Sequence, residues 1–159
     1  MMWNPLILSL WIGLAPAPIS IEPLPFAPEA WKRAAQVEVR VTEGGEPTVY
    51  SGIPLALVLD EQLRGSNRMA ALRSLSDAVI LVRASDGYQA AVSAAAVAMD
   101  PKGERFLLAL ARDGKPLGDR HGPVRLVIPG DPQRVRWVRM VASLHLVRLA
   151  PLKTTSPTR

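Results

Sequence analysis

The stretch RDGKPLGDRHGPVRLVIPG, residues 112–130, joins a tight-turn signal, a basic loop and an apolar run that carries one arginine. Its Asp113-Gly114 pair predicts a hairpin turn, because glycine accepts the positive φ that such turns require. A strand is predicted before the turn, over Phe106–Ala111, and another after it, over Val124–Ile128. Arg125, inside the second strand, is either solvated or held against an anion or a carbonyl group, since an unpaired buried charge is very costly.

The same pattern of strands and turns extends outward from this stretch. The Asp86-Gly87 pair separates two predicted strands, Val79–Val82 and Tyr88–Val92. Strict alternation of valines with polar residues predicts a half-buried strand over Val37–Thr42. The basic segment Arg134–Leu149 is interpreted as one long strand or two short ones.

Short helices complete the predicted organisation. In Pro54–Leu63 the apolar residues fall at helical spacing, with the proline suited to the first helical turn. A second helical piece is predicted over Met69–Leu75, and Ser93 is expected to cap a helical turn that follows it. The order of strand, helix, strands, helix and strands predicts an α+β domain of mixed β-sheets with short helices.

Composition limits the chemistry that the chain can perform. The 159 residues suffice for one domain, predicted over residues 21–150, and the net charge of +5 favours anionic partners. The chain has no cysteine and two histidines, so it offers no thiolate nucleophile or thiolate metal ligand, and few imidazoles for a metal site. Nucleic acid is not an expected partner, because the arginines are spread among apolar strands and there are few aromatic residues for stacking.

The two ends of the chain are expected to lie outside the folded domain. Residues 1–20 contain an apolar core followed by the small-residue triplet Ala15-Pro16-Ala17, which predicts an export signal and a periplasmic or secreted location. The alternative is an uncleaved N-terminal anchor, although its prolines leave less than the roughly 20 apolar residues that a span needs. The polar tail, residues 151–159, is predicted to be disordered.

Three segments together resemble a known family. SGIPLALVLDEQL at residues 51–63, VRASDGYQAAVS at residues 82–93, and the run LALARDGKPLGDRHGPVRLVIPGDPQRVRWVRMVASLHL at residues 108–146 are similar to the molybdopterin-binding domain of the sulfite oxidase superfamily. The resemblance covers roughly residues 37–148 and implies the sulfite oxidase-type molybdopterin-binding fold.

The chain departs from the catalytic members of that family at one point. In those members a cysteine thiolate, in the loop between the first strand and the body of the domain, holds molybdenum. Here the sequence runs from Val41 through TEGGEPTVYSG without a cysteine, so molybdenum is not expected. The chain more closely resembles short, exported, cysteine-free domains. Some of these look like periplasmic pterin-binding proteins that pass their ligand state to a membrane-bound cyclic-di-nucleotide signalling enzyme.

The resemblance also implies which residues contact a pterin or molybdopterin. His121 falls in the family loop that lies over the pterin, and Arg125 is the motif arginine of the pocket strand. Trp137, placed in the terminal strand, would form a stacking wall beside guanidinium groups. The candidate cofactor-binding residues are His121, Arg125, Trp137, Arg139, Arg120, Tyr88 and Arg83, and no catalytic or metal-ligating residue is assigned.

Each candidate has a structural alternative. The histidine could lie on the surface, Arg125 could be satisfied by structural hydrogen bonds, the tryptophan could belong to the core, and the other cations could face solvent. Three functions follow from these alternatives. The first is a non-catalytic pterin-binding module, the second a molybdopterin enzyme without a protein thiolate, and the third a structural or partner-binding domain with a closed pocket.

Overall fold

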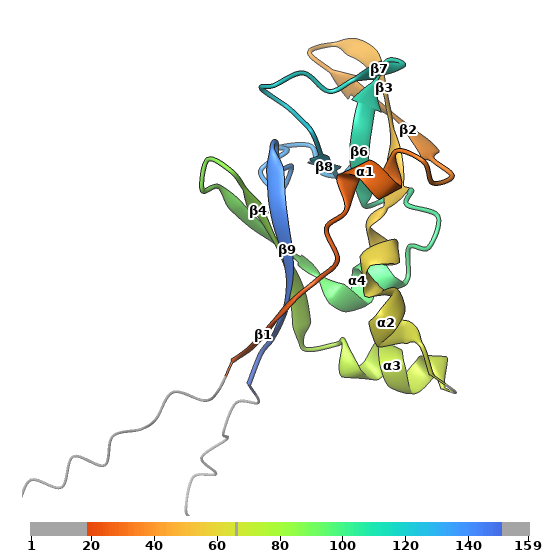
Figure 1. Cartoon of the computed structure of the whole chain (residues 1–159), viewed down its shortest axis with the longest axis vertical. Coiled ribbons are helices and arrows are strands. Elements are labelled where there is room, and N and C mark those ends of the chain that lie inside the picture. The colour runs from red at the N-terminus through yellow and green to blue at the C-terminus, as the bar shows by residue number, and fades with distance from the viewer. Residues whose placement is uncertain (1–18, 66, 151–159) are drawn as a thin grey trace, which may run out of the picture.

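A computed structural model describes residues 19–65 and 67–150, and Figure 1 shows their arrangement. Apart from Ile19 and Ser20, the predicted leader lies outside the described residues, and so does the predicted tail. Among the described residues, no helix combines the length and the apolar composition needed to cross a membrane.

Two antiparallel sheets form the body of the domain. The first contains β1 (Ser20–Pro23), β9 (Val141–Arg148), β4 (Ala78–Ala84) and β5 (Gln89–Ser93), in the spatial order β1-β9-β4-β5. The Asp86-Gly87 pair forms the turn between β4 and β5, as predicted, with Gly87 at a φ of 90°. The last strand of the chain therefore lies between the first strand and a hairpin from the middle of the sequence.

The second sheet contains five strands that come from three parts of the chain. β2 (Val37–Glu43), β3 (Glu46–Pro54), β6 (Leu107–Arg112) and β7 (Lys115–Pro116) follow one another in space, and β8 (Arg125–Val127) also pairs with β6. A single bridge between Leu126 and Val138 extends β8 toward the loop that follows it.

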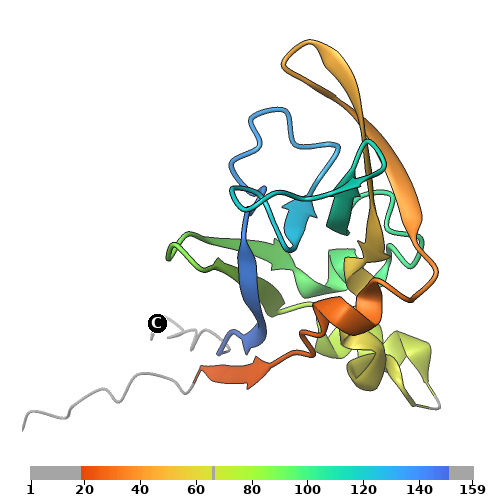
Figure 2. The same cartoon turned by 45° about the horizontal axis from the view of Figure 1, so that its top comes forward.

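The helices are short, and the last four pack near one another, whereas the first lies apart from them in Figure 1. α1 (Pro28–Trp31) precedes β2, whereas η1 (Leu55–Leu59), α2 (Asp60–Leu63) and α3 (Arg68–Ser74) follow β3. α4 (Ala94–Ala98) is capped by Ser93, whose hydroxyl accepts a hydrogen bond from the amide of Ala96 at 3.3 Å, as the sequence predicted. Figures 1 and 2 show α2 and α3 at the end opposite the β2–β3 hairpin and the loops around β8.

One continuous hydrophobic core joins both sheets and the helices. Fully buried side chains come from β3 (Ile53), β4 (Ile80), β6 (Leu108), β8 (Leu126) and β9 (Leu146). Burial of such aliphatic side chains is the main favourable contribution to folding, at about 1.5–3 kcal/mol each. The core therefore holds in place the strands that are joined by the β7–β8 and β8–β9 loops.

Three details of the predicted elements are corrected by the structure. Residues 46–54 form a strand, β3, whereas the sequence analysis assigned no strand there. Pro54 ends that strand and precedes a 3-10 helix, so it does not lie in the first turn of a helix. Trp137 lies in the loop between β8 and β9 and not in the terminal strand, which begins at Val141.

Asp100 joins the end of α4 to the start of β6 and is buried. Its carboxylate accepts hydrogen bonds from the amides of Glu104 at 3.1 Å, Arg105 at 2.9 Å and Phe106 at 2.9 Å. We expect Asp100→Ala to lower the free energy of unfolding by about 2–3 kcal/mol, because backbone donors lose their partner in a partly buried turn. Urea denaturation measures this loss. Glu104→Ala is the control, since it removes a neighbouring exposed carboxylate and keeps the backbone amide; an equal loss in both variants would contradict the capping role.

Candidate functional site

Three of the predicted site residues, Tyr88, Trp137 and Arg139, line one small pocket of about 140 Å³ together with Asp86. The pocket lies between the β4–β5 turn and the β8–β9 loop. The Tyr88 amide donates a hydrogen bond to Asp86 Oδ1 at 3.0 Å, and the Tyr88 hydroxyl donates to the backbone carbonyl of Val135. These bonds hold the turn against the loop. We call this pocket the Trp137 pocket.

Trp137 is fixed as a wall of the pocket. Its Nε1–H donates a hydrogen bond to the carbonyl oxygen of Ile128 at 2.8 Å, and 7 % of the residue remains exposed. The indole meets the ring of Tyr50 edge to face, with 6.1 Å between ring centroids. Trp137 belongs to the hydrophobic core and also lines the pocket, while its stacking on a pterin stays a prediction.

His121 lies on the neighbouring β7–β8 loop and lines a second pocket of about 390 Å³, which we call the His121 pocket. Arg112 and Lys115 contribute positive charge to its lining. The two loops touch, because the amide of Met140 donates a hydrogen bond to the carbonyl of His121 at 3.2 Å. Within the described part of the chain, Nδ1 of His121 is buried and has no hydrogen-bond partner.

The environment of His121 keeps its imidazole neutral. Burial lowers the pKa of His121 below its ordinary value of 6.5, and the positive charges of Arg125 and Arg139 lower it further. A neutral imidazole can accept a hydrogen bond at its free nitrogen, whereas an imidazolium can only donate.

This pKa shift predicts a dependence of stability on pH. The unfolded chain binds a proton at His121 near pH 6.5, while the folded chain binds it only at lower pH. The contribution of the neutral imidazole is therefore fully present above about pH 6.5 and decreases as the pH falls through the lowered pKa. We expect the free energy of unfolding of the wild type to decrease more steeply than that of His121→Gln between pH 7.5 and 5. Parallel slopes in urea denaturation would contradict the shift.

Arg125 lies in β8, and the structure answers the question that its position in an apolar strand raised. Its side chain is 7 % exposed and forms an ion pair with Glu43, whose Oε1 lies 3.1 Å from Nη2. Nη1 donates a hydrogen bond to the hydroxyl of Tyr50 at 2.5 Å. The guanidinium also lies 5.1 Å from the ring centroid of Trp137. Arg125 lines neither of the two pockets, and its contact with a ligand stays a prediction.

The remaining two candidates lie away from the pockets. Arg83 is exposed on β4, and Arg120 is exposed in the turn that precedes His121. Neither residue lines the Trp137 pocket or the His121 pocket. Their contact with a ligand stays a prediction that this arrangement does not support.

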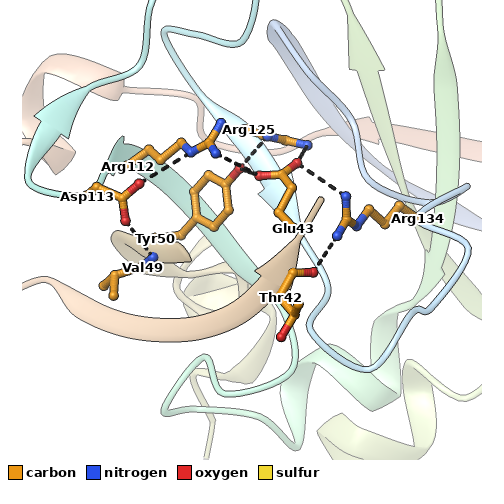
Figure 3. A network of polar contacts seen from close by, with 8 residues as sticks. All are labelled: Thr42, Glu43, Val49, Tyr50, Arg112, Asp113, Arg125 and Arg134. Atoms are coloured by element: carbon orange, nitrogen blue, oxygen red, sulfur yellow. Dashed lines mark hydrogen bonds and ion pairs between the residues drawn. The ribbon is translucent and has the colours of Figure 1, made fainter. Parts of the chain in front are cut away.

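Glu43, at the end of β2, is a central residue that the sequence analysis missed. Figure 3 shows its carboxylate at the centre of a polar network. Oε2 accepts a hydrogen bond from the hydroxyl of Tyr50 at 2.6 Å and lies 3.6 Å from Arg112, while Oε1 lies 3.5 Å from Arg134 and also pairs with Arg125. Three guanidinium groups thus converge on one carboxylate. Glu43 is the last residue of a strand with alternating apolar and polar residues, and this pattern does not distinguish it from an ordinary exposed residue.

The network determines the ionisation of its members. Burial opposes ionisation of Glu43, but the Tyr50 hydrogen bond and the charges of Arg125 and Arg112 outweigh it and lower its pKa below 4.5. Burial and the hydrogen bond to Glu43 raise the pKa of Tyr50 to about 12. Glu43 is therefore an anion and Tyr50 a neutral donor at physiological pH.

The residues fit the two parts of a molybdopterin cofactor differently. The Trp137 pocket offers aromatic walls, a carboxylate and a guanidinium, which suit a flat heterocycle with an amide edge. No thiolate exists for molybdenum, because the chain has no cysteine, and Glu43 lies in the segment after Val41 where the resemblance places that ligand. Residues 19–65 and 67–150 also contain no cluster of three or more His, Cys, Asp or Glu side chains arranged to hold a metal ion.

Comparison with known proteins agrees with the fold. A search of curated protein sequences finds no match to this chain. The family model of the oxidoreductase molybdopterin-binding domain matches residues 30–151, which include both sheets except β1 and both pockets. The chain therefore belongs to the oxidoreductase molybdopterin-binding domain family.

Proposed function

We propose that this domain binds a pterin-class ligand in the Trp137 pocket and does not hold molybdenum through a protein ligand. The observation that carries the proposal is the meeting of Asp86, Tyr88, Trp137 and Arg139 around one pocket in a member of a molybdopterin-binding family. A volume of about 140 Å³ is smaller than the roughly 300–1,000 Å³ of typical small-molecule sites. The pocket therefore suits a flat ring system and not a whole cofactor with its tail.

Each residue has a defined role in this proposal. Tyr88 and Trp137 provide aromatic surface for the pterin ring. One Asp86 oxygen holds the turn through the Tyr88 amide, and the other can accept from the N–H groups of the pterin amide edge. Arg139 can donate to a ring carbonyl. Across the shared loop contact, Lys115 of the His121 pocket offers positive charge to an anionic substituent of the ligand, whereas Arg112 is already paired with Glu43 and Asp113.

Removing the charge of Asp86 tests the proposal. We expect Asp86→Asn to weaken the binding of a simple pterin, measured by quenching of pterin fluorescence, by about 10- to 100-fold. The physical reason is the loss of a charge-assisted hydrogen bond worth about 1.5–3 kcal/mol, while the amide oxygen still holds the turn. Arg73→Ala is the control, because it removes an exposed charge on α3 at the opposite end of the molecule. Equal pterin affinity in wild type, variant and control would exclude the Trp137 pocket as the site.

The metal part of the proposal needs a direct assay on protein from its native location. Ligand released by acid and then oxidised should show pterin fluorescence, and molybdenum measured on the same sample should be absent. Stoichiometric molybdenum would favour the alternative of a molybdopterin enzyme without a protein thiolate. Absence of both pterin and metal would favour a structural domain.

We also propose that the protein is exported and reports its ligand state to a membrane-bound cyclic-di-nucleotide signalling enzyme. The apolar leader and the resemblance to exported, cysteine-free pterin binders support this role. Cell fractionation tests export. Co-purification with a membrane cyclase or phosphodiesterase, dependent on added pterin, tests the partner, and a cytoplasmic location without such a partner would contradict the proposal.

A further inference from the structure

The Glu43 network lies between the two pockets. Arg112 pairs with Glu43 and also lines the His121 pocket, whereas Arg125 and Arg134 lie against Trp137, which lines the other pocket. The guanidinium carbons of these two arginines are 5.1 Å and 5.2 Å from the centroid of the indole ring. The network therefore connects the walls of the two pockets.

The donors of the network are those of a site for an oxyanion. Three guanidinium groups and the Tyr50 hydroxyl point at two carboxylate oxygens, at distances from 2.6 to 3.6 Å. Arginine is the residue best suited to bind the planar edge of a carboxylate or the face of a phosphate. Arg125 is almost fully buried, so its charge needs an anion beside it whether or not a ligand is present.

The position of Glu43 is set by the backbone on both sides of it. Gly44 and Gly45 follow at φ values of 64° and 86°, a conformation that favours glycine and turns the chain back into β3. Nη2 of Arg134 donates a hydrogen bond to the carbonyl of Thr42 at 2.5 Å, which ties the β8–β9 loop to the end of β2. The β2–β3 hairpin thereby places the Glu43 carboxylate beside the arginines.

We propose that Arg112, Arg125 and Arg134 form an oxyanion site that the chain closes with its own Glu43 carboxylate. With Glu43 in place, its carboxylate occupies the position among the three guanidinium groups that a phosphate or another tetrahedral oxyanion would take, although Arg112 and Arg134 keep a partly exposed side. The adjoining pockets therefore select ligands without an anionic group at this point. This selectivity deepens the proposed pterin binding, but the closed oxyanion site exists whether or not a pterin binds.

Removal of Glu43 tests the inference with inorganic phosphate as the probe. Arg125 and Arg134 would then lose the carboxylate with which they pair, and Arg112 would keep Asp113, whose Oδ2 lies 3.5 Å from Nε of Arg112. We expect Glu43→Ala to bind phosphate at one saturable site by calorimetry, at least 10-fold more tightly than the wild type, and to gain thermal stability as phosphate is added. The wild type should show neither effect.

Glu46→Ala is the matched control, since Glu46 faces Glu43 across the same hairpin and is exposed. It removes the same charge and should behave as the wild type does. Equal phosphate binding by wild type and Glu43→Ala, or no saturable binding by a folded Glu43→Ala, would overturn the inference.

A second variant keeps the test decisive if Glu43→Ala does not fold. Glu43→Gln preserves the size and the acceptor oxygen of the side chain and removes its charge. We expect it to bind phosphate more tightly than the wild type, and equal affinities would overturn the inference. Pterin fluorescence quenching on the wild type is a separate readout, so failure of the proposed pterin binding can be distinguished from failure of the closed oxyanion site.

Discussion

Gly52→Ala should lower the free energy of unfolding by at least about 4 kcal/mol, which is enough to unfold a marginally stable domain. Gly52 lies in β3 at a point where the pairing register with β6 shifts. A Cβ atom there would lie 2.0 Å from the carbonyl oxygen of Leu108 and 2.7 Å from Cα of Ala109. Both are backbone atoms of the adjacent central strand, so a change of side-chain rotamer cannot relieve the clash.

The measurement is urea denaturation followed by far-ultraviolet circular dichroism. Gly130→Ala is the matched control, because a Cβ at Gly130 meets nothing within 4 Å and its φ does not lie in the left-handed region. The control should stay within about 0.5 kcal/mol of the wild type. Near-native stability of Gly52→Ala would mean that β3 and β6 can separate at the bulge without loss of the sheet.

The parts of the fold that the sequence predicted are those with local signals. Glycine turns after aspartate located the β4–β5 hairpin and the turn after β6, and alternating valines located β2. The prediction that the turn after β6 leads directly to the strand near Arg125 was wrong, because the short strand β7 follows the turn and β8 pairs with β6 later in the chain. β3 escaped prediction because its segment, EPTVYSGIP, has prolines near both ends and a glycine inside. β3 is a strand because it pairs with β2 on one side and with β6 on the other. Such pairing cannot be predicted from a short stretch of sequence.

In the loop after β8 the sequence predicted a strand that the structure does not contain. The alternation of basic and apolar residues around Trp137 favours a strand, but a strand needs a neighbour to pair with. Only Val138 forms a bridge, and Arg134 and Met140 adopt φ values of 52° and 50°, which bend the chain out of an extended course. Trp137 and Arg139 in this bent loop line the candidate pocket, so the candidate site depends on a departure from the regular pattern.

The candidate site was predictable only in part, for the same physical reason. The sequence predicted that Tyr88, Trp137 and Arg139 contact a pterin, and the structure places the three residues around one pocket, while the contact itself stays a prediction. Glu43 was missed because its partners lie between 7 and 91 residues away in sequence, and no local pattern reports such contacts. A buried arginine in an apolar strand was the one available sign that a carboxylate must lie near it.

Arg125→Ala is the second variant for which we expect a large effect, a loss of about 3–5 kcal/mol in the free energy of unfolding. The substitution removes the buried partner of Glu43, the donor to the Tyr50 hydroxyl, and a cation that lies 5.2 Å and 5.1 Å from the ring centroids of Tyr50 and Trp137. Glu43 would keep Arg112 and Arg134 at its more exposed side, so the loss should not exceed this range.

A double-mutant cycle with Glu43 separates the ion pair from the packing of the arginine stem. We expect Arg125→Ala and Glu43→Ala together to destabilise the protein by less than the sum of the single variants, because the two side chains contact each other. The wild-type contribution of Glu43 should also disappear in acid. Its lowered pKa means that the stabilisation is present above about pH 4.5 and is lost as the pH falls through the folded-state value.

Pterin binding by the Arg125 variant then decides between its two possible roles. The burial of Arg125 indicates a structural cation. In that case the pterin affinity of folded Arg125→Met should stay within a few-fold of the wild-type affinity, since methionine retains packing against Tyr50 and Trp137. A stable Arg125→Met variant without pterin binding would instead make the arginine a direct ligand contact. In that case Glu43 would have to leave the arginine when the ligand enters, and phosphate should then compete with pterin for the wild-type protein.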